Sequence, residues 1–389
     1  MRFTRDVLPV LALAAVAVSM PAPVPDDHDR PRQQPAPLAA TEMVRGADVG
    51  WLSEMESSGR EFQDASGRPG DLLDILKGLG INSIRLRVWV NPADGWCGKD
   101  DVVKMAKRAA SKGFRLMIDF HYSDSWADPG KQNKPASWKS HGIDQLKNDV
   151  ANHTTEVLKA LKDAGVSPEW VQVGNETNDG MLWEEGKASV GMANFAALVQ
   201  SGSKAVKAVF PDAKVVVHIS NGWDNSLFRW IFDGMKSNNV SWDVIGMSLY
   251  PEVATWRDTE AKCLSNMKDM VSRYGKEVVI SEVGLAMSAA DSSYALLKKL
   301  QSDVASLSSN KGVGVFYWEP EAYGGWKGYL LGAFDDNGKP TRAMNAFKEL
   351  MPPPSSTHRG APALPARQEG VRDAQGRLIA SPGALVPSY

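Results

Sequence analysis

Eight short apolar runs recur along the chain, and helical patterns separate them. The runs are Val44–Val49, Ser83–Trp89, Arg115–His121, Glu169–Gly174, Lys214–Ile219, Val244–Leu249, Glu277–Ser281 and Gly314–Trp318. Helical periodicity lies between or after them, for example over Asp71–Leu79, Asp100–Ser111, Ile143–Asp163, Met192–Val209 and Ala290–Leu307. Eight strand–helix units of this length predict an α/β fold in which a parallel sheet closes into a (β/α)8 (TIM) barrel.

A doubly wound open sheet is the alternative architecture. Such sheets usually carry a Gly-rich phosphate-binding loop after their first strand. The sequence that follows Val44–Val49 contains no such loop. We therefore predict the closed barrel, formed as a single domain.

Apolar and polar side chains alternate within several runs with the period of a β-strand. In IRLRVW the apolar side chains share one face, and Arg85, Arg87 and Trp89 share the other. LMIDFH, VVVHIS and VIGMSLY divide in the same way. One face would pack on the helices, and the other would place polar groups inside the barrel, where buried charges must pair. The catalytic sites of such barrels form where the strands end, and the residues at these ends include Trp89, His121, Tyr250 and Trp318.

Two glutamates follow apolar strands. Glu176 comes after the fourth run and Glu282 after the seventh. Glycoside cleavage needs one protonated and one ionised carboxyl group, and their surroundings must separate their pKa values. We predict Glu176 as general acid/base and Glu282 as nucleophile, although either glutamate alone could instead be a capping or ion-paired structural carboxylate. Arg85 and Arg87 would keep Glu282 ionised, and Asn175 would bind the sugar 2-hydroxyl.

This pattern resembles clan A of the glycoside hydrolases, whose members carry Asn-Glu after strand four and a nucleophilic Glu after strand seven. Longer segments are similar to family 53, namely RGADVGWLSEMESSG, INSIRLRVWVNPADG, MIDFHYSDSWADPGKQNKPASW, VQVGNETNDGMLW, ISEVG and FYWEPE. That family contains the endo-β-1,4-galactanases that act on type I arabinogalactan. The resemblance covers nearly all of residues 43–350, and FHYSDSWADPGKQ is much more specific than Asn-Glu.

The resemblance implies a retaining, endo-acting enzyme that works by double displacement, with its two carboxyl groups about 5–5.5 Å apart. It implies Glu176 as acid/base, Glu282 as nucleophile, Asn175 as the partner of Glu176, and Arg85 as the arginine beside the nucleophile. The residues implied to line the sugar subsite are His121, His218, Tyr250 and Trp318.

Several aromatic side chains are candidate platforms for sugar rings. Substrate would stack on Trp89, Trp223, Trp318 or Trp326, and filling of the core is the alternative for each. Asp48, which ends the first strand, is a candidate hydrogen-bond partner in the site, and a loop or helix cap is its alternative.

No cofactor is predicted for the reaction. Some bacterial relatives bind calcium in a late loop, and Asp335-Asp336-Asn337-Gly338 offers oxygen ligands. This segment lacks the EF-hand pattern, so we favour a simple turn. Cys97 and Cys263 could form one disulfide or remain two thiols, and no CxxC or HxxxH spacing supports zinc.

The two ends of the chain differ from the barrel segment. Arg2 and Arg5 precede the apolar run Val7–Met20, which predicts a signal peptide over residues 1–20 with no clear cleavage site. Residues 21–41 and 352–389 are rich in Pro and Ala and are predicted to be disordered arms around a catalytic domain at 42–351. We therefore expect a secreted or periplasmic monomer.

The net charge of −2 gives no indication of a nucleic-acid or membrane partner, so the expected partner is the polysaccharide β-1,4-galactan. Another clan A β-glycanase, acting on mannan, xylan or glucan, is the first alternative function. A non-catalytic polysaccharide-binding barrel would be expected to have lost one of the two carboxylates. A phosphate-handling isomerase would place a Gly-rich site late in the chain, where FYWEPEAYGGW is aromatic and acidic.

Overall fold

The computed structural model describes residues 42–349. Within this range eight parallel strands close into a barrel in the order β1-β10-β9-β8-β7-β6-β5-β4. The strands are β1 (Val44–Asp48), β4 (Ser83–Val88), β5 (Arg115–Phe120), β6 (Trp170–Val173), β7 (Lys214–Ile219), β8 (Val244–Leu249), β9 (Glu277–Val283) and β10 (Gly312–Trp318). The predicted (β/α)8 fold is confirmed, and the eight predicted runs match these strands to within three residues at each end.

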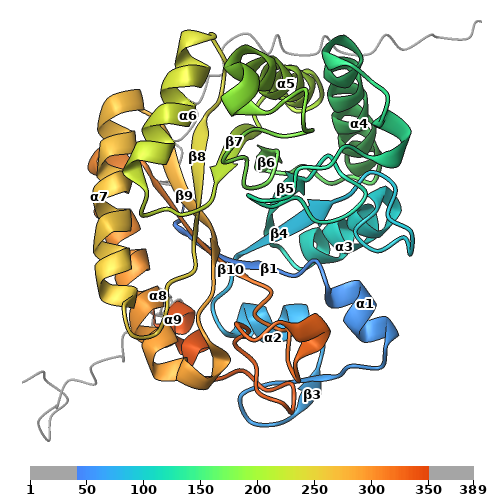
Figure 1. Cartoon of the computed structure of the whole chain (residues 1–389). Coiled ribbons are helices and arrows are strands. Elements are labelled where there is room, and N and C mark those ends of the chain that lie inside the picture. Colours follow the sequence, from blue (N-terminus) through green and yellow to red (C-terminus); the bar gives the residue numbers. More distant parts are fainter. Residues whose placement is uncertain (1–41, 350–389) are drawn as a thin grey trace, which may run out of the picture. The chain divides into compact units, whose positions relative to one another are not determined.

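Helices surround the ring of strands (Figure 1). They are α1 (Leu52–Ser57), α2 (Leu72–Gly78), α3 (Lys99–Ser111), α4 (Ile143–Asp163), α5 (Ala188–Val209), α6 (Asn225–Ser237), α7 (Trp256–Tyr274), α8 (Ala290–Ala305) and α9 (Asn345–Lys348). Local sequence sets their ends: the Asp71 carboxylate accepts hydrogen bonds from the first turn of α2, and Gly275 ends α7 in the left-handed conformation. A short antiparallel pair, β2 (Phe62–Gln63) and β3 (Pro69–Gly70), precedes α2.

The strand side chains divide into two faces, as the alternation predicts. Ile84, Leu86 and Val88 of β4 join the core between the strands and the helices. A second apolar cluster of strand residues fills the inside of the barrel, and its members are Val44, Met117, Trp170, Val216, Val244, Val279 and Phe316. Glycine at position 46 makes room for Phe316, because a Cβ there would lie 2.1 Å from the ring. The polar side chains of the barrel interior lie next to this apolar layer.

Several predictions concern segments away from the barrel strands. The signal peptide and both Pro-rich arms were predicted within residues 1–41 and 352–389, which lie outside the described residues. Among the residues that the structure describes, no helix is long and apolar enough to cross a membrane. Cys97 and Cys263 are both buried and unpaired, so the thiol alternative is the observed one.

The inner apolar layer generates a stability prediction. Trp170 is 1% exposed inside the barrel, so Trp170→Ala should lower the free energy of unfolding by about 3–5 kcal/mol, measured by chemical denaturation. Trp230→Ala is the matched control, because Trp230 is 43% exposed on α6 and its loss should change stability by less than about 0.5 kcal/mol. Equal losses in the two variants would contradict the filled-barrel packing.

Candidate active site

Arg85 organises the polar interior above the apolar layer. Its side chain is fully buried, and its Nη1 atom lies 2.6 Å from Asp48 Oδ2 and 2.9 Å from Glu282 Oε1. Its Nη2 atom lies 2.9 Å from Asp119 Oδ2 and also donates to Asn175 Oδ1 at 3.0 Å. One cation therefore joins residues from β1, β4, β5 and β9 and the loop after β6.

A β-bulge places Glu282 inside the barrel. Met247 of β8 pairs with Ile280, but the next residue, Ser248, pairs with Glu282, so Ser281 is an extra residue in β9. Strict alternation would put Glu282 on the same outer face as Ile280. The bulge turns it inward, where it receives Arg85 on one oxygen and the Tyr250 hydroxyl on the other, at 2.8 Å.

Glu176 is held by the loop that follows β6. Its φ of +45° is an uncommon conformation for a residue with a side chain. Hydrogen bonds to backbone groups hold the loop on both sides. Thr177 N donates to His218 O at 2.9 Å, and the side-chain Nε2 atom of Gln132 donates to Asn175 O at 2.9 Å. The Ser248 hydroxyl donates to Glu176 Oε1 at 2.7 Å.

The surroundings of the two glutamates differ in charge. Burial, and then the charge of Glu282, raises the pKa of Glu176 to about 8. Burial also raises the pKa of Glu282, but Arg85 and the Tyr250 hydroxyl oppose that rise. Because the cation contacts Glu282 directly, the shared proton belongs on Glu176 and the negative charge on Glu282.

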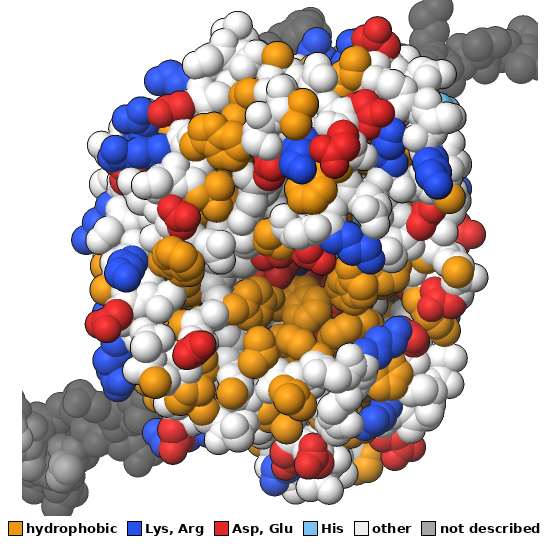
Figure 2. Space-filling view, viewed as in Figure 1, with side chains coloured by type: hydrophobic (Ala, Val, Ile, Leu, Met, Phe, Trp, Pro, Cys, Tyr) orange, Lys and Arg blue, Asp and Glu red, His pale blue; other side chains and the backbone are white. Residues whose placement is uncertain are grey.

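Both glutamates line one hollow of about 220 Å³ at the end of the barrel, and its other lining residues are His121, Trp126, Ala127, Asp128, Asn175, Tyr250 and Trp318. Figure 2 shows a hollow near the middle of the face in view, with acidic side chains at its bottom and hydrophobic side chains beside it. Trp126 and Trp318 meet edge to face with ring centroids 5.8 Å apart. The hollow therefore offers paired carboxyl groups next to half-buried aromatic rings.

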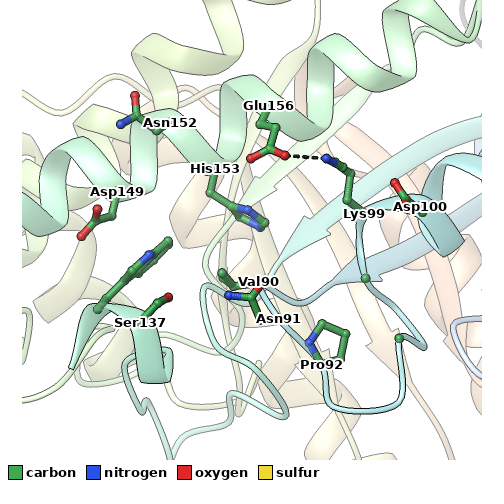
Figure 3. Close-up of a pocket in the computed structure, with 13 residues that line it drawn as sticks. Val90, Asn91, Pro92, Lys99, Asp100, Ser137, Asp149, Asn152, His153 and Glu156 are labelled. Carbon is green, nitrogen blue, oxygen red and sulfur yellow. Dashed lines mark hydrogen bonds and ion pairs between the residues drawn. The ribbon is translucent and has the colours of Figure 1, made fainter.

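A larger hollow of about 560 Å³ lies elsewhere, between the loop after β4 and helix α4 (Figure 3). Its polar groups pair with one another: Lys99 binds Glu156 across it, and Asp149 binds His141 next to it. None of its lining residues belongs to the hollow that holds the two glutamates. Its size alone therefore does not make it the chemical site.

Comparison with known proteins identifies the family. The model of glycosyl hydrolase family 53 matches residues 44–347, which is nearly the whole barrel. The chain belongs to glycosyl hydrolase family 53. The family predicted from the sequence is therefore confirmed, and the chain is a glycoside hydrolase.

The alignments with several relatives cover most of the length of each relative. A probable arabinogalactan endo-β-1,4-galactanase A from Neosartorya fischeri is 34% identical over 304 residues, which are 72% of this chain and 85% of that protein. A solved structure of a fungal β-1,4-galactanase has 30% identity and a TM-score of 0.74, covering 79% of this chain and 99% of the other. A family 53 catalytic domain from Ignisphaera aggregans has 30% identity and a TM-score of 0.73, covering 80% of this chain and 96% of that chain.

Most of the predicted site residues of this family 53 chain fall into two groups. Those that line the hollow are Glu176, Glu282, Asn175, His121, Tyr250 and Trp318. Those buried behind it are Asp48, Arg85, Arg87, His218 and Trp89, each no more than 8% exposed. Substrate binding by His218 and Trp89 stays a prediction, and in the structure this second group lies behind the residues that line the hollow.

His218 shows how the buried group acts. Burial, and then Arg85, holds the pKa of His218 well below its ordinary value, so the ring is neutral. Its Nδ1 atom lies 3.0 Å from Asn175 Oδ1, and its Nε2 atom lies 2.8 Å from the Ser248 hydroxyl that binds Glu176. Trp89 acts similarly on His121, since its Nε1 atom donates to His121 Nδ1 at 3.4 Å.

Three candidate residues lie away from the hollow or from Glu282. Arg87 does not touch Glu282: its ion pair is with Glu319, and its nearest other carboxylate is Asp48 at 3.7 Å. Trp223, 44% exposed in the loop after β7, is not among the residues that line the hollow. Trp326 is not among them either, and it packs under the Arg60 guanidinium at 5.5 Å.

Other residues of the site were not predicted as site residues. Asp119, Gln172 and Ser248 belong to the polar network, and strand alternation would have found them because each lies on an inner face. Trp126 lines the hollow from a loop, where no periodicity marks it. Glu319 follows Trp318 directly, and only the barrel brings it to Arg87.

The segment Asp335–Gly338 forms a turn. The Asp335 carboxylate accepts hydrogen bonds from Asn337 N at 2.9 Å and Lys339 N at 3.1 Å. Within residues 42–349, no group of three or more His, Cys, Asp or Glu side chains is placed to hold a metal ion. The predicted turn is therefore present, calcium binding stays the untested alternative, and at least one of the candidate oxygens already caps the turn.

The paired charges generate a second stability prediction. Arg85→Met would leave Asp48, Asp119 and Glu282 without their cation and should lower the free energy of unfolding at pH 7 by about 3–5 kcal/mol. Arg229→Met is the control, because its pair with Asp269 is 48% and 24% exposed and should contribute less than about 1 kcal/mol. Denaturant titration measures both, and a loss for Arg85→Met no larger than that of the control would refute the role of the buried cation.

Proposed function

We propose that this glycoside hydrolase is an arabinogalactan endo-β-1,4-galactanase that cleaves with retention of configuration. The observation that carries the mechanism is the unequal treatment of the two glutamates. Glu282 contacts Arg85 and the Tyr250 hydroxyl, whereas Glu176 has only the Ser248 hydroxyl and lies near the charge of Glu282. The family 53 relatives named as arabinogalactan endo-β-1,4-galactanases support the substrate.

In the first step, Glu282 attacks the anomeric carbon and the glycosidic bond breaks, while Glu176 donates its proton to the leaving oxygen. Glu176 is therefore a carboxylate in the covalent intermediate, and the neutral ester formed at Glu282 no longer raises its pKa. In the second step Glu176 takes a proton from the attacking water, whose oxygen bonds to the anomeric carbon as the bond to Glu282 breaks. His218 is neutral and lies beside Ser248. The Ser248 hydroxyl can therefore keep its hydrogen bond to Glu176 whether Glu176 is protonated or ionised.

Substrate would rest against the aromatic side of the hollow. Trp126 and Trp318 are half-buried there, so their rings present apolar area to the flat face of a galactose unit. Within residues 42–349, Asn175 Nδ2 donates to Ala127 O at 2.8 Å and to no other group, which leaves one amide hydrogen, and its oxygen is held by Arg85. That hydrogen is suited to the sugar 2-hydroxyl. We further propose action outside the cytoplasm as a monomer, supported by the predicted signal peptide and by the polymeric substrate.

Hydrolysis of a panel of polysaccharides tests the substrate. The purified chain should release reducing sugar from linear β-1,4-galactan and much less from mannan, xylan and cellulose, with oligosaccharides as the first products because the attack is internal. Release from mannan and not from galactan would overturn the galactanase assignment and leave the two-carboxylate mechanism intact. A chain that binds galactan without cleaving it would favour the non-catalytic alternative.

Azide rescue separates the roles of the two glutamates. With an aryl β-1,4-galactobioside and azide, Glu282→Ala should yield the α-glycosyl azide, because azide replaces the missing nucleophile in a single displacement. Glu176→Ala should yield the β-azide, because the covalent intermediate still forms and azide needs no general base. On galactan itself each variant should lose at least about 10²-fold in kcat. The opposite pair of products would exchange the two assignments, and wild-type rates would refute them.

A further inference from the structure

Behind the hollow, buried charges alternate in sign from Glu282 to the loop after β10. Arg85 joins Glu282 at 2.9 Å and Asp48 at 2.6 Å. The other oxygen of Asp48 lies 3.7 Å from Arg87, which forms an ion pair with Glu319. All five side chains are at least 93% buried. We call this series the charge ladder.

Outside the charge ladder, the guanidinium of Arg87 has few polar partners. Its Nε and Nη2 atoms form no hydrogen bond within the described residues. Tryptophan rings surround the guanidinium instead, with centroids 4.5 Å away for Trp126, 5.3 Å for Trp51 and 5.5 Å for Trp89. Rings hold a cation in place without neutralising it, so the charge of Arg87 acts on the carboxylates next to it.

Asp48 connects Arg87 to the proposed nucleophile. After burial, which raises the pKa of Glu282, and Arg85, which lowers it, the charges of Asp48 and Asp119 raise it further. Arg85 is in direct contact with all three carboxylates. A second cation next to Asp48 therefore reduces the repulsion that Asp48 exerts on Glu282.

Glu319 fixes the far end of the ladder. Trp51 N donates to its Oε2 atom at 3.1 Å, and its own backbone N donates to Asp48 O at 3.0 Å. Burial raises the pKa of Glu319 to about 7, with Arg87 opposing the rise and Asp48 adding to it. Glu319 is therefore the ladder group that takes up a proton near neutrality, and its protonation leaves Arg87 free to act on Asp48.

Burial favours the neutral form of three other titratable groups near Arg87 and Glu319. Burial, and then the charge of Glu319, raises the pKa of Glu321 well above its ordinary value. Burial raises the pKa of the Cys97 thiol to about 12 and that of the Tyr329 hydroxyl well above its ordinary value. The balance on Glu282 is thus set by the two arginines against Asp48, Asp119 and Glu319.

We propose that Arg87 and Glu319 are positioning residues of the hydrolytic site, which act through Asp48 and Arg85 to hold Glu282 as a carboxylate. The inference rests on the proposed function of Glu282 as nucleophile and adds two residues that never touch the substrate.

The test is the pH profile of kcat/KM, measured on an aryl β-1,4-galactobioside with the full chain. The acid limb of this profile reports the ionisation of Glu282 in the free enzyme. Arg87→Gln should move the acid limb to higher pH by about one unit, since it removes a positive charge near Asp48 in a medium of effective dielectric constant of about 20. Asp48→Asn should move it to lower pH, because it removes a negative charge.

Two further variants separate charge from packing. Arg87→Lys keeps the cation and should leave the limb within about 0.3 unit of its wild-type position, and Glu319→Gln should not raise it. Arg229→Gln, in a largely exposed pair with Asp269, is the control for a lost surface cation and should leave the limb unchanged. If the substitutions act only by disrupting packing, kcat should fall. The shifts of the acid limb should then not follow the sign of the charge removed.

The outcomes distinguish this inference from the proposed function. Wild-type protein that hydrolyses neither galactan nor the galactobioside would refute the proposed function. Active wild-type protein with an acid limb that Arg87→Gln does not move, or that Arg87→Gln and Asp48→Asn both raise, would refute the ladder alone. If Arg87→Gln does not fold, a limb that Asp48→Asn leaves in place or raises still overturns the inference.

Discussion

The buried guanidinium of Arg85 is the contact on which the active end of the barrel depends. It binds carboxylates from three strands, Asp48, Asp119 and Glu282, and it also holds Asn175 in the loop that carries Glu176. Charges this deeply buried are stable only when they are paired. The geometry of both glutamates is therefore tied to one cation.

Unequal contact with positive charge distinguishes two identical side chains. Glu176 and Glu282 are both removed from water, which favours the neutral acid in each. The contact with Arg85 selects Glu282 for the charge, and the resulting anion then strengthens the hold of Glu176 on its proton. Asp48, Arg87 and Glu319 extend the same balance of charges away from the hollow.

Local periodicity made the fold and part of the site predictable. A two-residue alternation in β4 already places Arg85 and Arg87 inside the barrel, and Gly-terminated helical segments mark the units between strands. The same pattern could not tell the two arginines apart. Both face inward, but only Arg85 lies level with Glu282, whereas Arg87 lies one pleat further along β4 and meets Glu319. That choice depends on the stagger of neighbouring strands, which no single segment encodes.

The sequence by itself determined the eight-stranded barrel, its polar interior and the two glutamates at strand ends, because each follows from short-range spacing along the chain. The tertiary structure alone decided how Glu282 turns inward, since strict alternation in β9 points it outward and the bulge at Ser281 reverses it. It also decided which tryptophans face the hollow. Trp126 and Trp318 do, while Trp223 and Trp326 do not, because loop positions are set by packing between segments far apart in the chain.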